Sequence, residues 1–246
     1  MSVDEITLNE SNVDDADQWA DHPLAHFLAG AWRNTVRTFS REHAHYEALA
    51  EIDAVFRQLV EHASQGTERL ACSMLVRTHG SLLAASSLAL SGQVAESYVL
   101  MRNALGSALQ GIFLAGNAER QQIWIARADD DQAAELMQLT FADGSMLEHL
   151  RELDGTTAAI FERLYQRTID RGAHPNAHGR FVHSGVDQPV DFARAYLITD
   201  DDVQRMALRS AAQVGICTLS MFYYVYGELY RAHKLDARLA KLRQGH

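Results

Sequence analysis

Two long apolar segments, residues 67–91 and 93–116, dominate the pattern of hydrophobic and polar positions along the chain. Each is apolar around most of its circumference and far longer than a β-strand, which predicts two buried helices. The dipeptide Ser91-Gly92 interrupts the pattern and predicts a tight turn, so that the two helices form an antiparallel hairpin. Small residues such as Gly106 predict that other helices approach closely. We therefore expect this hairpin at the centre of the fold.

Amphipathic helical periods continue on both sides of the hairpin, over about residues 24–39, 41–63, 155–172 and 203–233. The low proline content and the scarcity of β-branched runs also favour helix. The sequence therefore predicts an all-α protein, a single bundle of about seven helices. Further helix starts are predicted at the capping residues Thr67, Asn117, Asp129–Asp131, Ser145, Asp154 and Asp200–Asp202.

The segment of residues 174–199 departs from this helical pattern. It contains Pro175 and Pro189, and its apolar residues alternate with polar ones over two short runs. Such alternation is typical of half-buried strands. We expect at most one short β-hairpin, near residues 180–198.

Charge is distributed unevenly and divides the chain into three regions. The formal net charge is −10, but residues 1–21 carry seven acidic residues and no Lys or Arg, which leaves only −3 for the rest. We interpret residues 1–20 as a flexible acidic leader, residues 21–233 as the bundle domain, and residues 234–246 as a basic C-terminal tail. The nearly balanced body is compatible with an anionic partner such as RNA.

Cysteine usage and the N-terminal composition indicate a cytoplasmic protein. Cys72 and Cys217 lie in apolar helical sequence, which is typical of reduced core residues. The N-terminus is acidic and polar, unlike a secretory signal. Charged residues interrupt the central helices, and the most apolar remaining stretch, residues 211–227, is short for a membrane span. We expect no membrane segment.

One stretch combines basic side chains with histidine and therefore suggests chemistry. Arg163, Arg167 and Arg171 are spaced by four residues, so they form a stripe on one face of the predicted helix. His174 follows three residues later, and Pro175 places it at the helix end. An imidazole beside guanidinium groups can bind a phosphodiester and transfer protons. Arg167, Arg171 and His174 are the candidate catalytic residues.

Three further residues are candidates for binding: Arg102, Asn176 and His178. Arg102 shares a helical face with Tyr98 and Leu105, so we expect it to be largely buried, with a partner from another segment. A structural ion pair is the preferred interpretation of Arg102. Asn176 and His178 lie in the turn after the arginine-bearing helix.

The histidines do not predict a metal site. His43 and His45 are two residues apart on a predicted helix and point in different directions. The second cluster, His174, His178 and His183, has no acid or thiol at ligand spacing. No glycine-rich phosphate loop or serine nucleophile motif is present. We expect neither a metal nor a cofactor.

Two motifs resemble those of a family of uncharacterised bacterial all-helical proteins. The first is G-Q-x-x-E-[AS]-Y-x-x-x-R, at residues 92–102, and the second is D-x-G-A-H-P-N, at residues 170–176. Arg167 to His174 is also distantly similar to the Arg-x4–6-His motif of HEPN domains, helical bundles that often dimerise and include metal-independent RNases. This resemblance implies that Arg167 would hold phosphate and that His174 would act on the ribose 2′-OH.

Three functional interpretations follow, and they leave open whether the protein is an enzyme. The preferred one is a dimerising helical module that binds a partner or a small molecule. The alternative is a HEPN-like, metal-independent RNase, as in a toxin or defence component; a metalloenzyme is least favoured. The extent of apolar helix, which includes aromatic residues near the C-terminus, predicts a homodimer or higher assembly.

Overall fold

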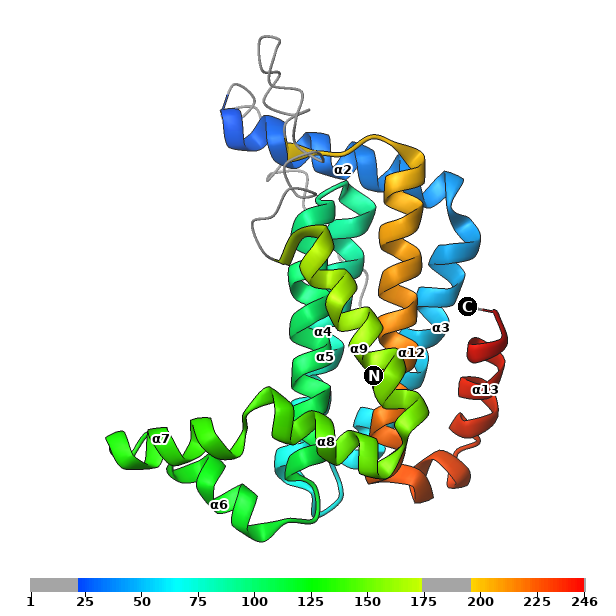
Figure 1. Ribbon diagram of the computed structural model, residues 1–246. Coiled ribbons are helices and arrows are strands. Elements are labelled where there is room, and N and C mark those ends of the chain that lie inside the picture. Colours follow the sequence, from blue (N-terminus) through cyan, green and yellow to red (C-terminus); the bar gives the residue numbers. More distant parts are fainter. Residues whose placement is uncertain (1–21, 174–195, 246) are drawn as a thin grey trace, which may run out of the picture.

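The computed structural model describes residues 22–173 and 196–245, and these residues are almost entirely helical (Figure 1). No strand is present among them, so the predicted all-α class is confirmed. The elements are α2 (Pro23–Arg41), α3 (His43–Ala63), α4 (Arg69–Ser91), α5 (Val94–Leu114), α6 (Ala118–Ala126), α7 (Asp131–Thr140), α8 (Asp143–Leu153), α9 (Gly155–Thr168), the π-helical turn η2 (Ile169–Ala173), α12 (Asp201–Ala232) and α13 (Leu235–Gly245).

Helices α4 and α5 form the central hairpin that the sequence predicts (Figure 1). Gly92 ends α4 with a φ of 89°, a left-handed conformation in which glycine is favoured. The backbone N–H of Gln93 then donates to the carbonyl of Leu88 at 2.8 Å and closes the turn. A Cβ at Gly92 would also lie 2.3 Å from the carbonyl oxygen of Ile198. The turn therefore requires glycine for both its conformation and its packing.

Helix α12 is the longest element and packs against α3, α4, α5 and α9. Glycines allow this close packing: a Cβ at Gly215 of α12 would lie 2.7 Å from Cγ2 of Ile52. A Cβ at Gly111 of α5 would lie 2.9 Å from Cε1 of Phe222. Gly106, by contrast, has no described neighbour within 4 Å of such a Cβ. The prediction of a tight contact at Gly106 is therefore wrong within the described chain.

The described chain has more helices than the predicted seven or so. The additional helices include the short α6, α7 and α8, of which α6 and α7 project from the bundle as an arm (Figure 1). Most of the segment interpreted as a basic tail forms α13. Leu235, Leu239 and Leu242 of α13 are buried, because their spacing places them on one face against the bundle.

Two predicted regions cannot be compared with the structure, because they fall largely outside the described residues. These are the acidic leader of residues 1–20 and most of the expected β-hairpin near residues 180–198. The described residues 197–200 are irregular and lead directly into α12. No described helix is long and apolar enough to cross a lipid bilayer.

Capping was predicted well where aspartate or asparagine precedes a helix. Ser145 and Thr67 were wrong as caps, because α8 begins at Asp143 and α4 begins after Glu68, each without a side-chain cap. The confirmed caps accept backbone N–H groups of the first helical turn, and they are Asn117, Asp130, Asp154 and Asp200.

Candidate functional site

A groove of about 780 Å³ lies where α9 and α13 flank α12. Its apolar walls include Ile160 and Leu164 of α9, Ile216 of α12 and Leu239 of α13. Ile160 and Leu164 are one helical turn apart, so α9 presents both to the same groove. Concave sites of this size with mainly apolar walls are typical of small-molecule binding sites.

Three guanidinium groups line this groove: Arg163 and Arg167 of α9, and Arg243 of α13. Nη1 of Arg167 donates to Oε1 of Gln213 at 2.5 Å. Nε of Arg243 donates to Oγ of Ser220 at 3.2 Å. Both acceptors are neutral, and no carboxylate of the described chain forms an ion pair with any of the three arginines. Their positive charge is therefore not paired directly with a carboxylate of the described chain, although Asp154 and Asp236 also line the groove.

The opposite end of the groove is acidic and is organised by Asp154. The Asp154 carboxylate accepts hydrogen bonds from Oγ1 of Thr157 at 2.6 Å and from the hydroxyl of Tyr224 at 2.9 Å. The hydrogen bond from Thr157 is the main cause that lowers the pKa of Asp154. Burial, together with the neighbouring Asp154, raises the pKa of Tyr224 to about 12. The Tyr224 hydroxyl is therefore a neutral hydrogen-bonding group at neutral pH.

The groove is polarised along the axis of α12. Tyr224 contacts the first turn of α9 through Asp154, whereas Gln213 contacts its last turns through Arg167. Eleven residues of helix separate Gln213 from Tyr224, which corresponds to about 16 Å. A ligand that spans the groove thus meets Arg167 at one end and the Tyr224–Asp154 pair at the other. Arg243 lies nearer the second end, because it donates to Ser220, one turn before Tyr224.

The structure places only part of the predicted catalytic set. Arg167 lines the groove, whereas Arg171 lies half-buried in η2 and is not part of the groove lining. Burial raises the pKa of the Tyr98 hydroxyl, and the positive charges of Arg171 and Arg167 act in the opposite direction. A Cβ at Gly172 would lie 2.7 Å from Cα of Ala95, so η2 packs tightly on the start of α5. His174, Asn176 and His178 lie outside the described residues.

Arg102 is half-buried on α5 and faces α9 away from the groove. Its Nη2 donates to the hydroxyl of Tyr165 at 2.9 Å, and its guanidinium carbon lies 4.9 Å from the centre of the Tyr165 ring. Hydrogen bonding combined with a cation–π contact stabilises the contact between the two helices. Arg102 thus lies at a contact between α5 and α9, and the ion pair expected from the sequence stays a prediction.

Metal ligation has no geometric basis in the described chain, where no three His, Cys, Asp or Glu side chains are grouped to hold an ion. His43 lies 3.2 Å from a carboxylate oxygen of Glu47, and His45 lies 3.0 Å from one of Glu42. Cys217 borders the groove but is buried, and burial raises the pKa of its thiol to about 12. The thiol is therefore unreactive as a nucleophile at neutral pH.

Sequence reasoning missed Gln213 and Arg243 as groove residues, and it interpreted the aromatic run that contains Tyr224 as core or oligomer interface in preference to a ligand pocket. Gln213 and Tyr224 lie in a long apolar helix whose exposed side cannot be identified from its period alone. Arg243 was assigned to a tail, although the apolar residues 235, 239 and 242 have the spacing of an amphipathic helix. That spacing was the sequence signal that this segment forms a helix, α13, which borders the groove beside α9 and α12.

A comparison with protein-family models, curated proteins and solved structures found no match to this chain. The function of the groove is therefore inferred from its geometry and charge.

Proposed function

We propose that the protein binds an organic anion in the groove between α9, α12 and α13. The observation that carries this proposal is the convergence of Arg163, Arg167 and Arg243 on one concavity without a carboxylate partner in the described chain. A guanidinium group offers a planar fork of donors that matches a carboxylate or a phosphate. An anion bound there would supply the missing compensating charge.

The apolar walls define the rest of the ligand. Leu164 and Leu239 are already buried, but Ile160 and Tyr223 are only half-buried. A free inorganic anion would leave these two side chains in contact with water, whereas an apolar body attached to the anion would cover them. The hydroxyl of Tyr224 adds a hydrogen-bonding group at the far end. The ligand class is therefore an amphipathic molecule with a carboxylate or phosphate head and an apolar body.

Two fluorescent probes test the contribution of the anionic head separately from that of the apolar body. 8-Anilinonaphthalene-1-sulfonate is an anion, and N-phenyl-1-naphthylamine is a closely similar molecule without the sulfonate. We expect Arg167→Gln to weaken binding of the anionic probe on the order of tenfold, because a charge-assisted hydrogen bond is lost. Binding of the uncharged probe should change little.

Arg33→Gln is the matched control, since Arg33 is exposed on α2 and lies outside the groove. It removes the same charge and should leave both titrations unchanged. Equal loss of affinity for both probes in Arg167→Gln would indicate a damaged groove and not a lost anion contact. Unchanged affinity for the anionic probe in both Arg163→Gln and Arg167→Gln would contradict the proposal.

RNA is a second candidate ligand, because Arg163 and Arg167 lie one helical turn apart at the rim of the groove. Two guanidinium groups in this arrangement can contact successive phosphates. A metal-independent RNase would further need His174 close to these arginines. Incubation of the protein with RNA in EDTA, beside the His174→Ala variant, tests this candidate. Cleavage that depends on His174 and leaves a 2′,3′-cyclic phosphate would support it.

A further inference from the structure

Helix α2 packs with a polar face toward the bundle and leaves its large apolar side chains in solvent. Its buried residues are Ala31, Asn34 and Thr38, whereas Trp32 is 68% exposed. The exposed apolar residues follow a spacing of three or four and therefore form a continuous stripe along one side of the helix. We call Leu24, Leu28, Trp32, Val36 and Phe39 the α2 stripe.

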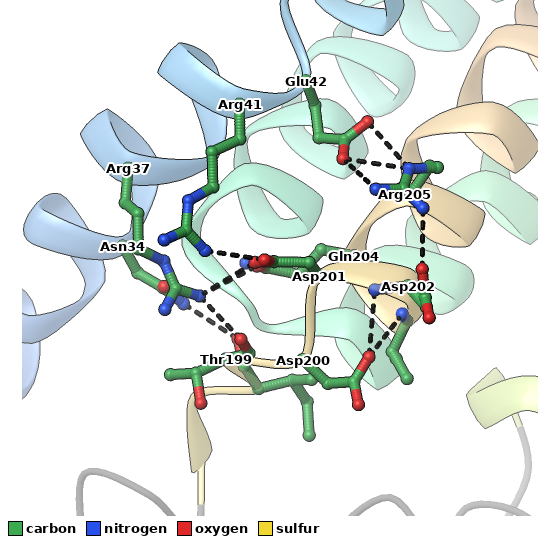
Figure 2. A network of polar contacts seen from close by, with 12 residues as sticks. Asn34, Arg37, Arg41, Glu42, Thr199, Asp200, Asp201, Asp202, Gln204 and Arg205 are labelled. Carbon is green, nitrogen blue, oxygen red and sulfur yellow. Dashed lines mark hydrogen bonds and ion pairs between the residues drawn. The ribbon is translucent and has the colours of Figure 1, made fainter.

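A polar network holds α2 in this orientation (Figure 2). Nδ2 of Asn34 donates to the carbonyl oxygens of Ser91 and Ile198, each at 2.9 Å. An arginine on each of the next two turns reaches the segment that begins α12. Arg37 donates to the carbonyl of Thr199 at 2.8 Å, and Arg41 donates to the carboxylate of Asp201 at 2.6 Å. Rotation of the helix to bury the stripe would break all of these contacts.

We propose that the α2 stripe is the interface of a homodimer, in which a second copy of this chain covers it. The five side chains are between 40% and 68% exposed, which corresponds to roughly 500 Å² of apolar surface. A standard protein interface buries about 800 Å² on each partner, with an apolar centre and a polar rim. The stripe is therefore large enough for the apolar centre of such an interface, and the polar side chains beside it on α2 would form the rim.

The order of residues in the stripe suits an antiparallel two-fold arrangement. Trp32 lies at its middle, with Leu28 one turn before it and Val36 one turn after. A two-fold axis at Trp32 would place Trp32 against its symmetry mate and Leu28 against Val36 of the other copy. Each copy then offers the same patch, and a buried tryptophan at the centre is typical of interface hot spots.

Charge on α2 favours a protein partner over a lipid surface. A helix that lies on an anionic membrane uses free Lys or Arg side chains beside its apolar face. Arg37 and Arg41 instead lie near the carboxylate of Asp201, at 3.7 Å and 2.6 Å. The charge of these two arginines is thus partly compensated within the protein, which leaves the exposed Arg33 as the remaining arginine of α2. The stripe also lies apart from the groove, so this proposal does not depend on the ligand proposed there.

Light scattering coupled to gel filtration gives the mass of the full-length chain in solution. We expect a dimer of twice 27.4 kDa for the wild type and a monomer for Trp32→Glu. Leu139→Glu is the matched control, because Leu139 is 67% exposed on the projecting arm. It should stay dimeric. Circular dichroism should show the same helix content for all three proteins.

A disulfide across the proposed axis tests the arrangement without disturbing the fold. A chain with both Leu28→Cys and Val36→Cys, in a background of Cys72→Ser and Cys217→Ala, keeps Trp32 and should form intermolecular disulfides under mild oxidation. Leu139→Cys in the same background should not. A wild-type monomer at all concentrations, or a Trp32→Glu dimer, would overturn the proposal. Wild-type monomer that sediments with anionic vesicles, when Trp32→Glu does not, would identify a lipid surface as the occupant instead.

Discussion

The guanidinium of Arg167 donates to the side-chain amide oxygen of Gln213 at 2.5 Å, across the groove between α9 and α12. The contact orients Arg167 but does not neutralise it, because the acceptor has no net charge. A carboxylate in the same place would form an ion pair and reduce the attraction of Arg167 for a ligand. A single substitution at Gln213 can therefore change the charge of the site while its shape stays nearly the same.

Gln213→Glu should weaken binding of the anionic probe on the order of tenfold, because the new carboxylate competes for Arg167. The melting temperature shows whether the variant keeps the fold, in which Glu retains an acceptor for Arg167 at this position. Fluorescence titration and thermal unfolding of the same preparation measure both effects. Gln58→Glu is the control: Gln58 accepts from Arg238 at 3.0 Å outside the groove, and this change should not alter probe binding. Wild-type affinity in Gln213→Glu would refute the role of Arg167.

Two glycines on α5 should respond to alanine in opposite directions. At Gly111 the new Cβ would lie 2.9 Å from Cε1 of Phe222 and 3.0 Å from Cβ of Met74, so we expect a loss of about 1–3 kcal/mol of stability. At Gly106 no described atom lies within 4 Å, so the greater helix propensity of alanine should add about 0.5–1 kcal/mol. Urea unfolding measures both free energies. Equal shifts of the midpoint would contradict this packing.

The central hairpin was predictable because local signals agree with the tertiary structure. Continuous apolar sequence, the break at Gly92 and the length of each segment all indicate the same two helices. The orientation of α2 was not predictable in this way. Its period correctly indicates a helix, yet Asn34 and Thr38 are buried while Trp32 is exposed. Hydrogen bonds to Ser91 and to the segment before α12 decide which face is buried, and these partners are distant in sequence.

The groove illustrates a second limit of sequence reasoning. The arginine stripe on α9 was visible as a pattern, and Arg167 does line the groove. Its other functional side chains come from α12 and α13, so only the fold brings them together. The basic character of residues 234–246 concealed an amphipathic helix, because Leu235, Leu239 and Leu242 stand among Lys and Arg. The contact of Arg102 with Tyr165 likewise joins residues far apart in sequence.

Asp154 should contribute to both the start of α9 and the far end of the groove. Its carboxylate accepts from the backbone N–H of Thr156 at 2.9 Å, and also from the hydroxyls of Thr157 and Tyr224. We expect Asp154→Ala to lower the free energy of unfolding by about 1–2 kcal/mol, the usual effect of losing an N-cap. Asp154→Asn should lose less, because asparagine also caps helices. Chemical denaturation at pH 7 compares them; equal losses would argue against a capping role.

His149 should make the stability of the protein depend on pH below neutrality. The ring is half-buried with its centre 5.6 Å from that of Phe113. Burial is the main cause that lowers the pKa of His149 below the usual value for histidine, and the charge of Arg120 acts in the same direction. Glu152 and the backbone of Ile112 oppose this shift. The neutral imidazole is thus favoured in the folded state.

The sign of the pH effect follows from this lowered pKa. As the pH falls through about 6.5, the unfolded chain takes up a proton at His149 before the folded chain does, so stability decreases with falling pH. Burial also lowers the pKa of His79, so a decrease should remain when His149 is replaced. We expect the melting temperature of His149→Gln to fall less between pH 7.5 and 5.5 than that of the wild type. His26→Gln, at an exposed position on α2, should retain the wild-type slope. An identical slope in His149→Gln would show that this ring does not couple protonation to folding.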